Sequence, residues 1–444
     1  MPQSQNTVSY HRRVWNLAWP MILSNVSVPL LGVVDTAILG HLPSPEYLSG
    51  VAIGAAVVSM LLWAFGFLRM GTTGLVARSA DGGESWLVRA LALAVCLGAL
   101  LVPMAWPLMG SAVQWMNASA EAAPHAETYL KIRLLSAPLA LANFALLGFF
   151  IGRQDSRAPL YMLLAANLLN IALDVLFIIG LGMGASGAAL ATVCADIFAF
   201  ALGLSLLRRV DRNIFSSIRR ILDRSDFWPW RAGGPWKELV RINTDLFFRT
   251  LLLLFTFAFF TAQGAKQGDT VLAANAILIQ LLMMTSYALD GFAHATEALV
   301  GDAISRQSQR QFRATIRAAG HWALATALVI TLVFIAGEPL ILPLFTNLAP
   351  VLTEARNVYG WLCALPLIAV WSYQLDGVFI GAGKSRQMRD TMFVATALVF
   401  LPFWWLTQSW NNHGVWFSLF LWFTARSIGL LIYFYYYTWK KIWI

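Results

Sequence analysis

The chain has 444 residues, of which 59% are hydrophobic and only 12% are charged. A water-soluble protein of this length could not cover so much apolar surface, so the composition indicates an integral membrane protein. The formal net charge of +9 would suit nucleic-acid binding if the basic residues formed one patch. They lie instead between apolar segments, which indicates membrane topology and excludes a nucleic-acid partner.

Twelve apolar segments are long enough to cross roughly 30 Å of hydrocarbon. Each is continuous and exceeds the ~10 residues of a barrel strand, which predicts helices. In chain order the predicted spans are 14–40, 47–78, 87–115, 127–152, 159–182, 186–209, 237–265, 270–302, 315–343, 353–381, 388–409 and 414–438. We therefore expect an all-α polytopic membrane protein with twelve transmembrane helices.

The Lys and Arg residues between the spans fall mostly on one side of the predicted membrane. That side includes the N-terminus, the basic 208–241 segment, the 384–389 loop and the C-terminus. The other side carries Lys131, Arg133, Lys266 and Arg356. The positive-inside rule then predicts that both termini lie in the cytoplasm.

The two halves of the chain repeat one another. At an offset of 229 residues, a ten-residue window contains six identities, and a weaker set at an offset of 224 joins the second and eighth spans. The aligned residues include Gly148 with Gly377 and Gly152 with Gly381. Six spans per half make the repeat parallel, about an axis along the membrane normal. We expect two six-helix lobes, 1–209 and 237–444, joined by a basic cytoplasmic linker, 210–236, and separated by a central cleft.

Polar residues inside the first six spans form a candidate ion-binding site, because an ionisable group in hydrocarbon costs at least a few kcal/mol. Asp35 lies near the outer end of the first span, and Asn170 and Asp174 lie on one stripe of the fifth span. Further polar positions are Asn143 on the fourth span and Thr192 and Asp196 on one face of the sixth. We expect one acidic pocket in this half.

Carboxylates in a low-dielectric cavity cannot all ionise cheaply, so at least one is expected to bind a proton near neutral pH. The same oxygens could ligate Na⁺ instead. A third interpretation stays open, in which Asp35 and Asp174 only accept hydrogen bonds at helix bends or face the wet boundary.

The second half carries a different set of charges. Asp245 and Arg249 lie one turn apart on the seventh span, Asp290 lies on the eighth and Asp376 near the end of the tenth. Carboxylate–Arg pairs here could hold an inner gate shut or could be static buried ion pairs. Arg426 is a further cation that needs a partner.

Several stretches of the chain resemble the multidrug and toxic compound extrusion (MATE) transporters. The first helix carries the resemblance in Pro20-Met21 and in residues 33–41, and it continues in residues 170–174 and 187–192. Leu68-Arg69-Met70 and residues 287–292 make the chain most similar to the DNA-damage-inducible protein F subfamily.

The resemblance implies a MATE fold in a bacterial inner membrane, and a monomer that exports amphipathic organic cations in exchange for H⁺ or Na⁺ by alternating access. Pro20 would permit a bend in the first helix. Many family members carry a Glu on the seventh span where this chain has Arg249, so a second Na⁺ site is not expected there. The implied N-lobe cation site comprises Asp35, Tyr129, Asn143, Asn170, Asp174 and Thr192, of which Asp35, Asn170 and Asp174 would ligate Na⁺.

Three other classes of protein fit the sequence less well. A flippase for a lipid or lipid-linked substrate is the first alternative, but such a passenger is anionic and the predicted pocket is acidic. A passive channel suits a duplicated lobe pair with an off-axis pocket less well. An enzyme is not indicated, because the Gly383-Lys384-Ser385 stretch lacks the upstream glycine of a phosphate-binding loop and no hydrolase motif occurs. We expect no cofactor other than the coupling ion.

Overall fold

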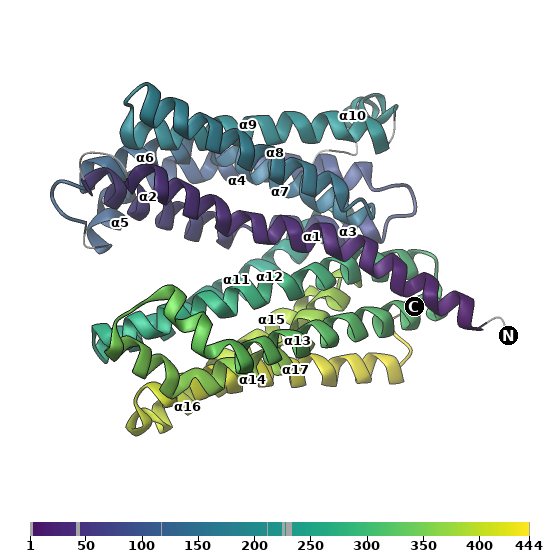
Figure 1. Ribbon diagram of the computed structural model, residues 1–444. Helices are drawn as coiled ribbons and strands as arrows, with labels where there is room; N and C mark the ends of the chain where they lie inside the picture. The colour runs from purple at the N-terminus through teal and green to yellow at the C-terminus, as the bar shows by residue number, and fades with distance from the viewer. Residues whose placement is uncertain are drawn as a thin grey trace. The chain divides into compact units, whose positions relative to one another are not determined.

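The computed structural model describes residues 3–40, 45–116, 118–210, 212–223, 227 and 233–443. Within its helices, the side chains of residues 3–9, 28–31, 33, 35–37, 40, 45 and 233 lie outside this description. Every regular element in the described ranges is a helix (Figure 1). The prediction of an all-α protein is confirmed.

The chain divides into two compact units. The N unit comprises Leu23–Val240, and the C unit comprises Arg241–Ile444 together with the part of α1 up to Ile22. One helix, α1 (Gln3–Gly40), therefore contributes to both units. The lobe boundaries expected from the sequence, at residues 209 and 237, stay a prediction.

The N unit continues with α2 (Pro45–Ala64), α3 (Phe67–Ala77), α4 (Glu84–Ala105), α5 (Met109–Trp115), α6 (Ala123–Leu135), α7 (Ala137–Gly152), α8 (Arg157–Asp174), α9 (Gly184–Val210) and α10 (Ile214–Leu222). A π-helical turn, Val175–Gly180, extends α8, and a 3-10 turn, Trp106–Leu108, joins α4 to α5. The predicted linker thus contains a short helix, α10.

The C unit contains α11 (Gly233–Lys266), which begins in the N unit, α12 (Asp269–Ser305), α13 (Gln309–Phe345), α14 (Ala349–Gly381), α15 (Ser385–Phe393), α16 (Leu401–Leu406) and α17 (Asn412–Trp439). A π-helical segment, Val394–Phe400, lies between α15 and α16, and a 3-10 turn, Gln408–Trp410, precedes α17.

Nine of the described helices are long and apolar enough to cross a membrane, or ten if the pair α6 and α7, bent by 54°, forms one span. These ten coincide with the predicted spans except the first and the eleventh. The first corresponds to α1, part of whose side chains are outside the description. The eleventh is divided into α15, a π-helical segment and α16. The arrangement is consistent with twelve spans.

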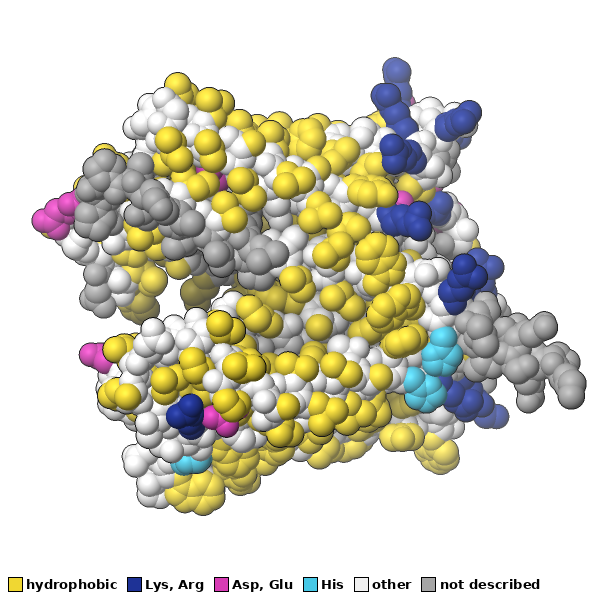
Figure 2. Space-filling model, viewed as in Figure 1, with side chains coloured by type: hydrophobic (Ala, Val, Ile, Leu, Met, Phe, Trp, Pro, Cys, Tyr) yellow, Lys and Arg dark blue, Asp and Glu magenta, His cyan; other side chains and the backbone are white. Residues whose placement is uncertain are grey.

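Each unit has an apolar surface and a basic end. In Figure 2 hydrophobic side chains cover the helix flanks, and most of the visible Lys and Arg side chains of each unit gather at one end of its helices. On α13, Val329, Leu332 and Ile335 are all more than half exposed. Such surfaces suit contact with lipid chains, with the charged ends in water.

A close glycine contact recurs in the two units. A Cβ on Gly148 of α7 would lie 2.5 Å from the carbonyl oxygen of Arg69 on α3, and a Cβ on Gly377 of α14 would lie 2.5 Å from that of Ala293 on α12. The offsets found in the sequence, 229 and 224 residues, relate both members of one contact to those of the other. The repeat is therefore a repeat of packing geometry, in which small residues let two helix backbones meet.

The turn that follows each glycine helix is also repeated. The backbone N–H of Asp155 donates to Phe150 O at 2.9 Å, and that of Lys384 donates to Phe379 O at 2.8 Å. In each turn the preceding residue has a positive φ, 61° at Gln154 and 66° at Gly383. This is the left-handed helix termination that satisfies the last carbonyls of a helix.

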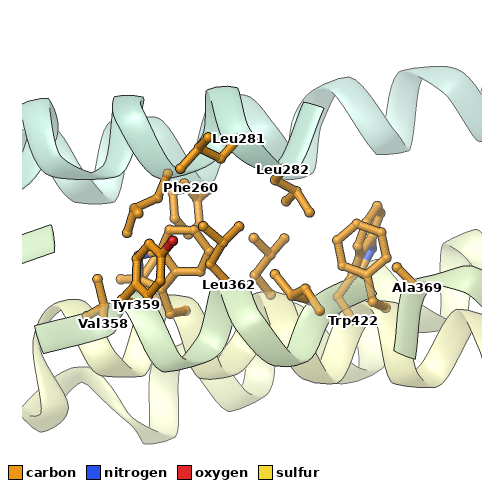
Figure 3. Packing of buried hydrophobic residues seen from close by; sticks show 14 of the residues in the cluster. Phe260, Leu281, Leu282, Val358, Tyr359, Leu362, Ala369 and Trp422 are labelled. Atoms are coloured by element: carbon orange, nitrogen blue, oxygen red, sulfur yellow. The ribbon is translucent and has the colours of Figure 1, made fainter. Parts of the chain in front are cut away.

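Large side chains fill the core of the C unit. Phe260, Leu281, Leu362 and Trp422 converge between α11, α12, α14 and α17 (Figure 3). The indole N–H of Trp422 donates to Thr396 Oγ1 at 3.0 Å, so its polar atom is not left unpaired by burial.

We predict that Gly377→Ala lowers the free energy of unfolding by about 1–3 kcal/mol, because its methyl group would overlap a backbone carbonyl that cannot move independently of α12. Gly360→Ala, on the same helix and with no atom within 4 Å of its new Cβ, is the matched control and should be neutral or stabilising by up to ~1 kcal/mol. Thermal unfolding of the purified proteins in detergent measures both. Equal unfolding temperatures for the two variants would contradict the packing account.

Candidate functional site

Two of the predicted site residues are deeply buried on α8. Asn170 and Asp174 are each 1% exposed and lie one turn apart on one face of the helix. The backbone of Asp35 lies in α1, but its side chain is outside the described part of the structure. The described part of the site is therefore the polar face of α8 and the residues in contact with it.

The polar stripe of α8 meets α1 one turn earlier. The amide nitrogen of Asn167 donates to Ser27 Oγ at 3.2 Å and lies 3.4 Å from the backbone oxygen of the same residue. Three candidate spans lie between α1 and α8, so the two helices run in the same direction. At 1.5 Å per residue, Asp174 lies ~10 Å beyond this contact along α8, and the backbone of Asp35 lies ~12 Å beyond it along α1.

The side-chain amide of Asn170 is buried. Among the described residues, neither its Oδ1 nor its Nδ2 has a hydrogen-bond partner. A buried polar group without a partner costs about 1–3 kcal/mol, so this position carries a thermodynamic penalty in the absence of a ligand. A bound cation or water could offset that penalty through the amide oxygen.

Other predicted N-lobe residues belong to a separate cluster around Arg133. Asp196 Oδ2 accepts from Arg133 Nη1 at 2.6 Å, and Asn143 Nδ2 donates to the backbone oxygen of Asp196 at 3.0 Å. The Thr192 hydroxyl donates within its own helix, to Ala188 O at 3.0 Å. Tyr129 is buried one turn before Arg133 on α6. The charge of Asp196 is therefore balanced by a protein cation, unlike an open cation site.

Arg133 is buried, which its place among the basic residues of the outer side did not predict. Its side chain is only 7% exposed and lies on α6 of the bent α6–α7 pair. Its position toward the outer side of the membrane stays a prediction. The segment around Lys131 and Arg133 is polar in the sequence, which does not indicate burial. The ion pair between Arg133 on α6 and Asp196 on α9 explains how this Arg can be buried. The signal for it in the sequence was a carboxylate on a neighbouring predicted span, Asp196.

The described part of the C unit carries a buried triad of charges. Arg249 on α11 and Arg426 on α17 both donate to Asp376 Oδ2 on α14, at 2.5 and 3.0 Å. Arg426 is 2% exposed, and its guanidinium also lies 4.7 Å from the ring centre of Trp422. Asp376 thus joins three helices and supplies the partner that Arg426 was expected to need.

The remaining predicted gate residues are distributed differently. Asp245 and Arg249 are not paired with each other, because Asp245 accepts from Arg389 at 2.6 Å and from Ser385 at 2.9 Å. Asp290 is half-buried on α12, one turn beyond Ser286, whose hydroxyl contacts that of Tyr373 on α14. Asp245 therefore pairs with α15 and not with the Asp376 triad, and a gate made of all four residues stays a prediction.

Comparison with known proteins places this architecture in a family. The family model described as MatE matches residues 20–176 and 246–406, one segment in each half of the chain. The chain is 39% identical over 442 residues to DNA damage-inducible protein F of Escherichia coli strain K12, covering 98% of this chain and 93% of that protein. It is 26% identical over 410 residues to a probable multidrug resistance protein NorM of Thermotoga maritima, covering 87% and 83%.

Solved structures agree with the fold. A structure of MATE in the bent conformation superposes with a TM-score of 0.84 at 20% identity, over 98% of this chain and 99% of that one. A multidrug resistance MATE transporter in the outward-facing conformation superposes with a TM-score of 0.81 at 20% identity, over 95% and 94%. The chain belongs to the MatE family. It is a multi-pass membrane transporter and not an enzyme.

We predict opposite effects for Asn170→Leu and Asn167→Leu, two changes of similar shape on one helix. Asn170→Leu should stabilise the ligand-free protein by about 1–3 kcal/mol, because it removes a buried amide that makes no hydrogen bond to any described residue. Asn167→Leu should destabilise it by about 1 kcal/mol, because it removes a hydrogen bond to α1. Thermal unfolding at low salt measures the difference, and destabilisation by Asn170→Leu would show that its amide is satisfied.

We also predict that Asp376→Asn lowers the free energy of unfolding by about 3–5 kcal/mol, because two buried guanidinium groups lose their shared counterion. Glu338→Gln, which breaks the exposed pair with Arg356, is the matched control and should change it by less than ~1 kcal/mol. Chemical denaturation in detergent compares the variants. Similar losses in both would rule out a structural role for the triad.

Proposed function

We propose that this protein exports amphipathic organic cations in exchange for H⁺ that enters the cell. The observation that carries the proposal is the buried pair Asn170 and Asp174, on the helix that contacts α1. The amide of Asn170 has no hydrogen-bond partner among the described residues, and α1 carries Asp35. A relative supports it by name, since the NorM protein of Thermotoga maritima is called a probable multidrug resistance protein.

The coupling step is proton uptake by the carboxylates of Asp35 and Asp174. Two carboxylates at a similar depth in hydrocarbon disfavour double ionisation, so one proton shared between them is favourable. A cationic passenger competes for the same negative charge. Protonation from the outside therefore releases the passenger, and deprotonation on the inner side restores the affinity for the next one.

We infer that the conformational change of the transporter depends on a bend in α1. This helix passes from the C unit to the N unit between Ile22 and Leu23, two residues after Pro20. Proline lacks the N–H of one helical hydrogen bond, so a bend at Pro20 costs less than elsewhere. A change of charge at Asp35 would thereby alter a helix that belongs to both units and bias the protein between its two open states.

Na⁺ is the alternative coupling ion for the same residues. Carboxylate and amide oxygens suit a hard cation, and Asp35, Asn170 and Asp174 would supply them. In the described ranges, which omit the Asp35 side chain, no group of three His, Cys, Asp or Glu residues lies close enough to hold a metal ion.

The protein is proposed to act as a monomer in the inner membrane, with the basic ends of both units in the cytoplasm.

A flippase has less support. Its passenger would carry a phosphate, and the candidate pocket of the N unit presents Asp174 while its buried Arg133 is already paired with Asp196. An acidic pocket favours a cationic passenger.

We predict that Asp35→Asn and Asp174→Asn each reduce export of a fluorescent organic cation to background, because neither variant can release a proton at that position. Asp269→Asn, an exposed carboxylate at the start of α12, should export normally. Proteoliposomes with H⁺ and Na⁺ gradients imposed separately provide the measurement. Export by the wild-type protein that ignores both gradients would overturn the exchanger, and export driven by Na⁺ alone would overturn proton coupling.

A further inference from the structure

The basic linker contains a short helix, α10 (Ile214–Leu222), that the proposed export site does not use. It begins four residues after the end of α9, which is one of the candidate membrane spans. Because a chain extends by at most ~3.5 Å per residue, α10 starts within ~14 Å of the end of that span. The helix is therefore held close to the membrane surface.

One face of α10 packs on the N unit. Ile214 is fully buried, and Ile218, one turn later, packs against the same apolar cluster. That cluster includes Leu87 of α4 and Leu207 of α9, and α10 contacts both of these helices. The helix thus lies against the end of the N unit instead of extending away from it.

A second stripe of α10 is exposed. Phe215, Arg219 and Leu222 follow at i, i+4 and i+7, and each is exposed. The guanidinium of Arg208, at the end of α9, lies 5.1 Å from the ring centre of Phe215. Two apolar side chains and two guanidinium groups therefore form one patch, the α10 flank, which comprises Arg208, Phe215, Arg219 and Leu222.

The linker carries excess positive charge however its residues pair with one another. Residues 208–231 contain seven Arg, three Asp and no Lys or Glu, which gives a net charge of +4. In the described ranges, Arg208 and Arg219 form no ion pair. Lys and Arg side chains gather at the end of the N unit where α10 lies (Figures 1 and 2). This end of the unit therefore attracts anions.

The combination of charge and apolar surface indicates the partner. Arginines attract anionic headgroups, and apolar side chains on the same flank can enter the boundary between headgroups and acyl chains. A soluble acidic partner fits less well, because Phe215 and Leu222 are apolar and adjoin the end of a span. We propose that α10 is an interfacial helix, and that its flank binds the anionic phospholipids of the leaflet at the basic end of the N unit.

Native mass spectrometry of the full-length protein in detergent tests the choice of lipid. The wild-type protein should retain phosphatidylglycerol about fivefold better than phosphatidylcholine. Arg208→Gln combined with Arg219→Gln should reduce this preference about threefold or more, because the flank loses both of its charges.

A matched pair of changes in the C unit separates the α10 flank from basic residues in general. Arg313→Gln combined with Arg317→Gln removes the same charge from exposed residues of α13 and should leave the preference unchanged. An equal loss in this variant would overturn the assignment to α10. The same preference in the wild-type protein and the α10 variant would overturn it as well.

Electron paramagnetic resonance in proteoliposomes tests whether the flank enters the bilayer. Spin labels are placed at Leu222→Cys and, on a different face of α10, at exposed Ser216→Cys. The native Cys96, Cys194 and Cys363 are replaced by Ala in both proteins.

In vesicles that contain phosphatidylglycerol, the label at residue 222 should be about threefold less accessible to a water-soluble nickel reagent than the label at residue 216. This protection should weaken in vesicles of phosphatidylcholine alone, because the attraction of the arginines is lost. Equal accessibility of the two labels in phosphatidylglycerol vesicles would mean that the flank lies in water, and would overturn the proposal.

Discussion

A charged side chain surrounded by hydrocarbon must find an opposite charge inside the protein, because neither lipid nor distant water can solvate it. In the C unit this requirement joins α11, α14 and α17, because Arg249 and Arg426 both donate to Asp376. In the N unit, Arg133 and Asp196 join α6 to α9 by the same means. The charges in these groups are already paired within the protein. The amide of Asn170, which has no hydrogen-bond partner in the described part of the chain, is therefore the stronger candidate for ligand binding.

The duplication explains how the two units can differ in chemistry and agree in structure. Contacts that depend on the absence of a side chain, at Gly148 and Gly377, are kept because any Cβ there would meet a carbonyl oxygen. Asp155 and Lys384 occupy equivalent positions of the repeated turn and differ in charge, yet the backbone hydrogen bonds of the turn are the same.

The helix α1 connects these local features to transport. A conformational change of a membrane transporter needs an element whose shape depends on the charge state of the site. In this protein α1 carries Asp35, makes contact with α8 through Ser27, and passes between the units close to Pro20. Export of a cation, as proposed, would therefore depend on how firmly the C unit holds the segment around Pro20, where Ala18 and Ile22 lie against Gly291.

The sequence by itself determined the membrane character, the positions of the spans, the duplication and the basic ends. All four depend on properties that add along the chain, namely hydropathy, charge and spacing. It also identified Asn170 and Asp174 as neighbours on one helical face. Only the tertiary structure decided the pairing of charges, because a partner depends on which faces of distant helices meet. Asp245 and Arg249 are one turn apart yet bind different helices, and Arg133 could be recognised as buried only once Asp196 was placed beside it.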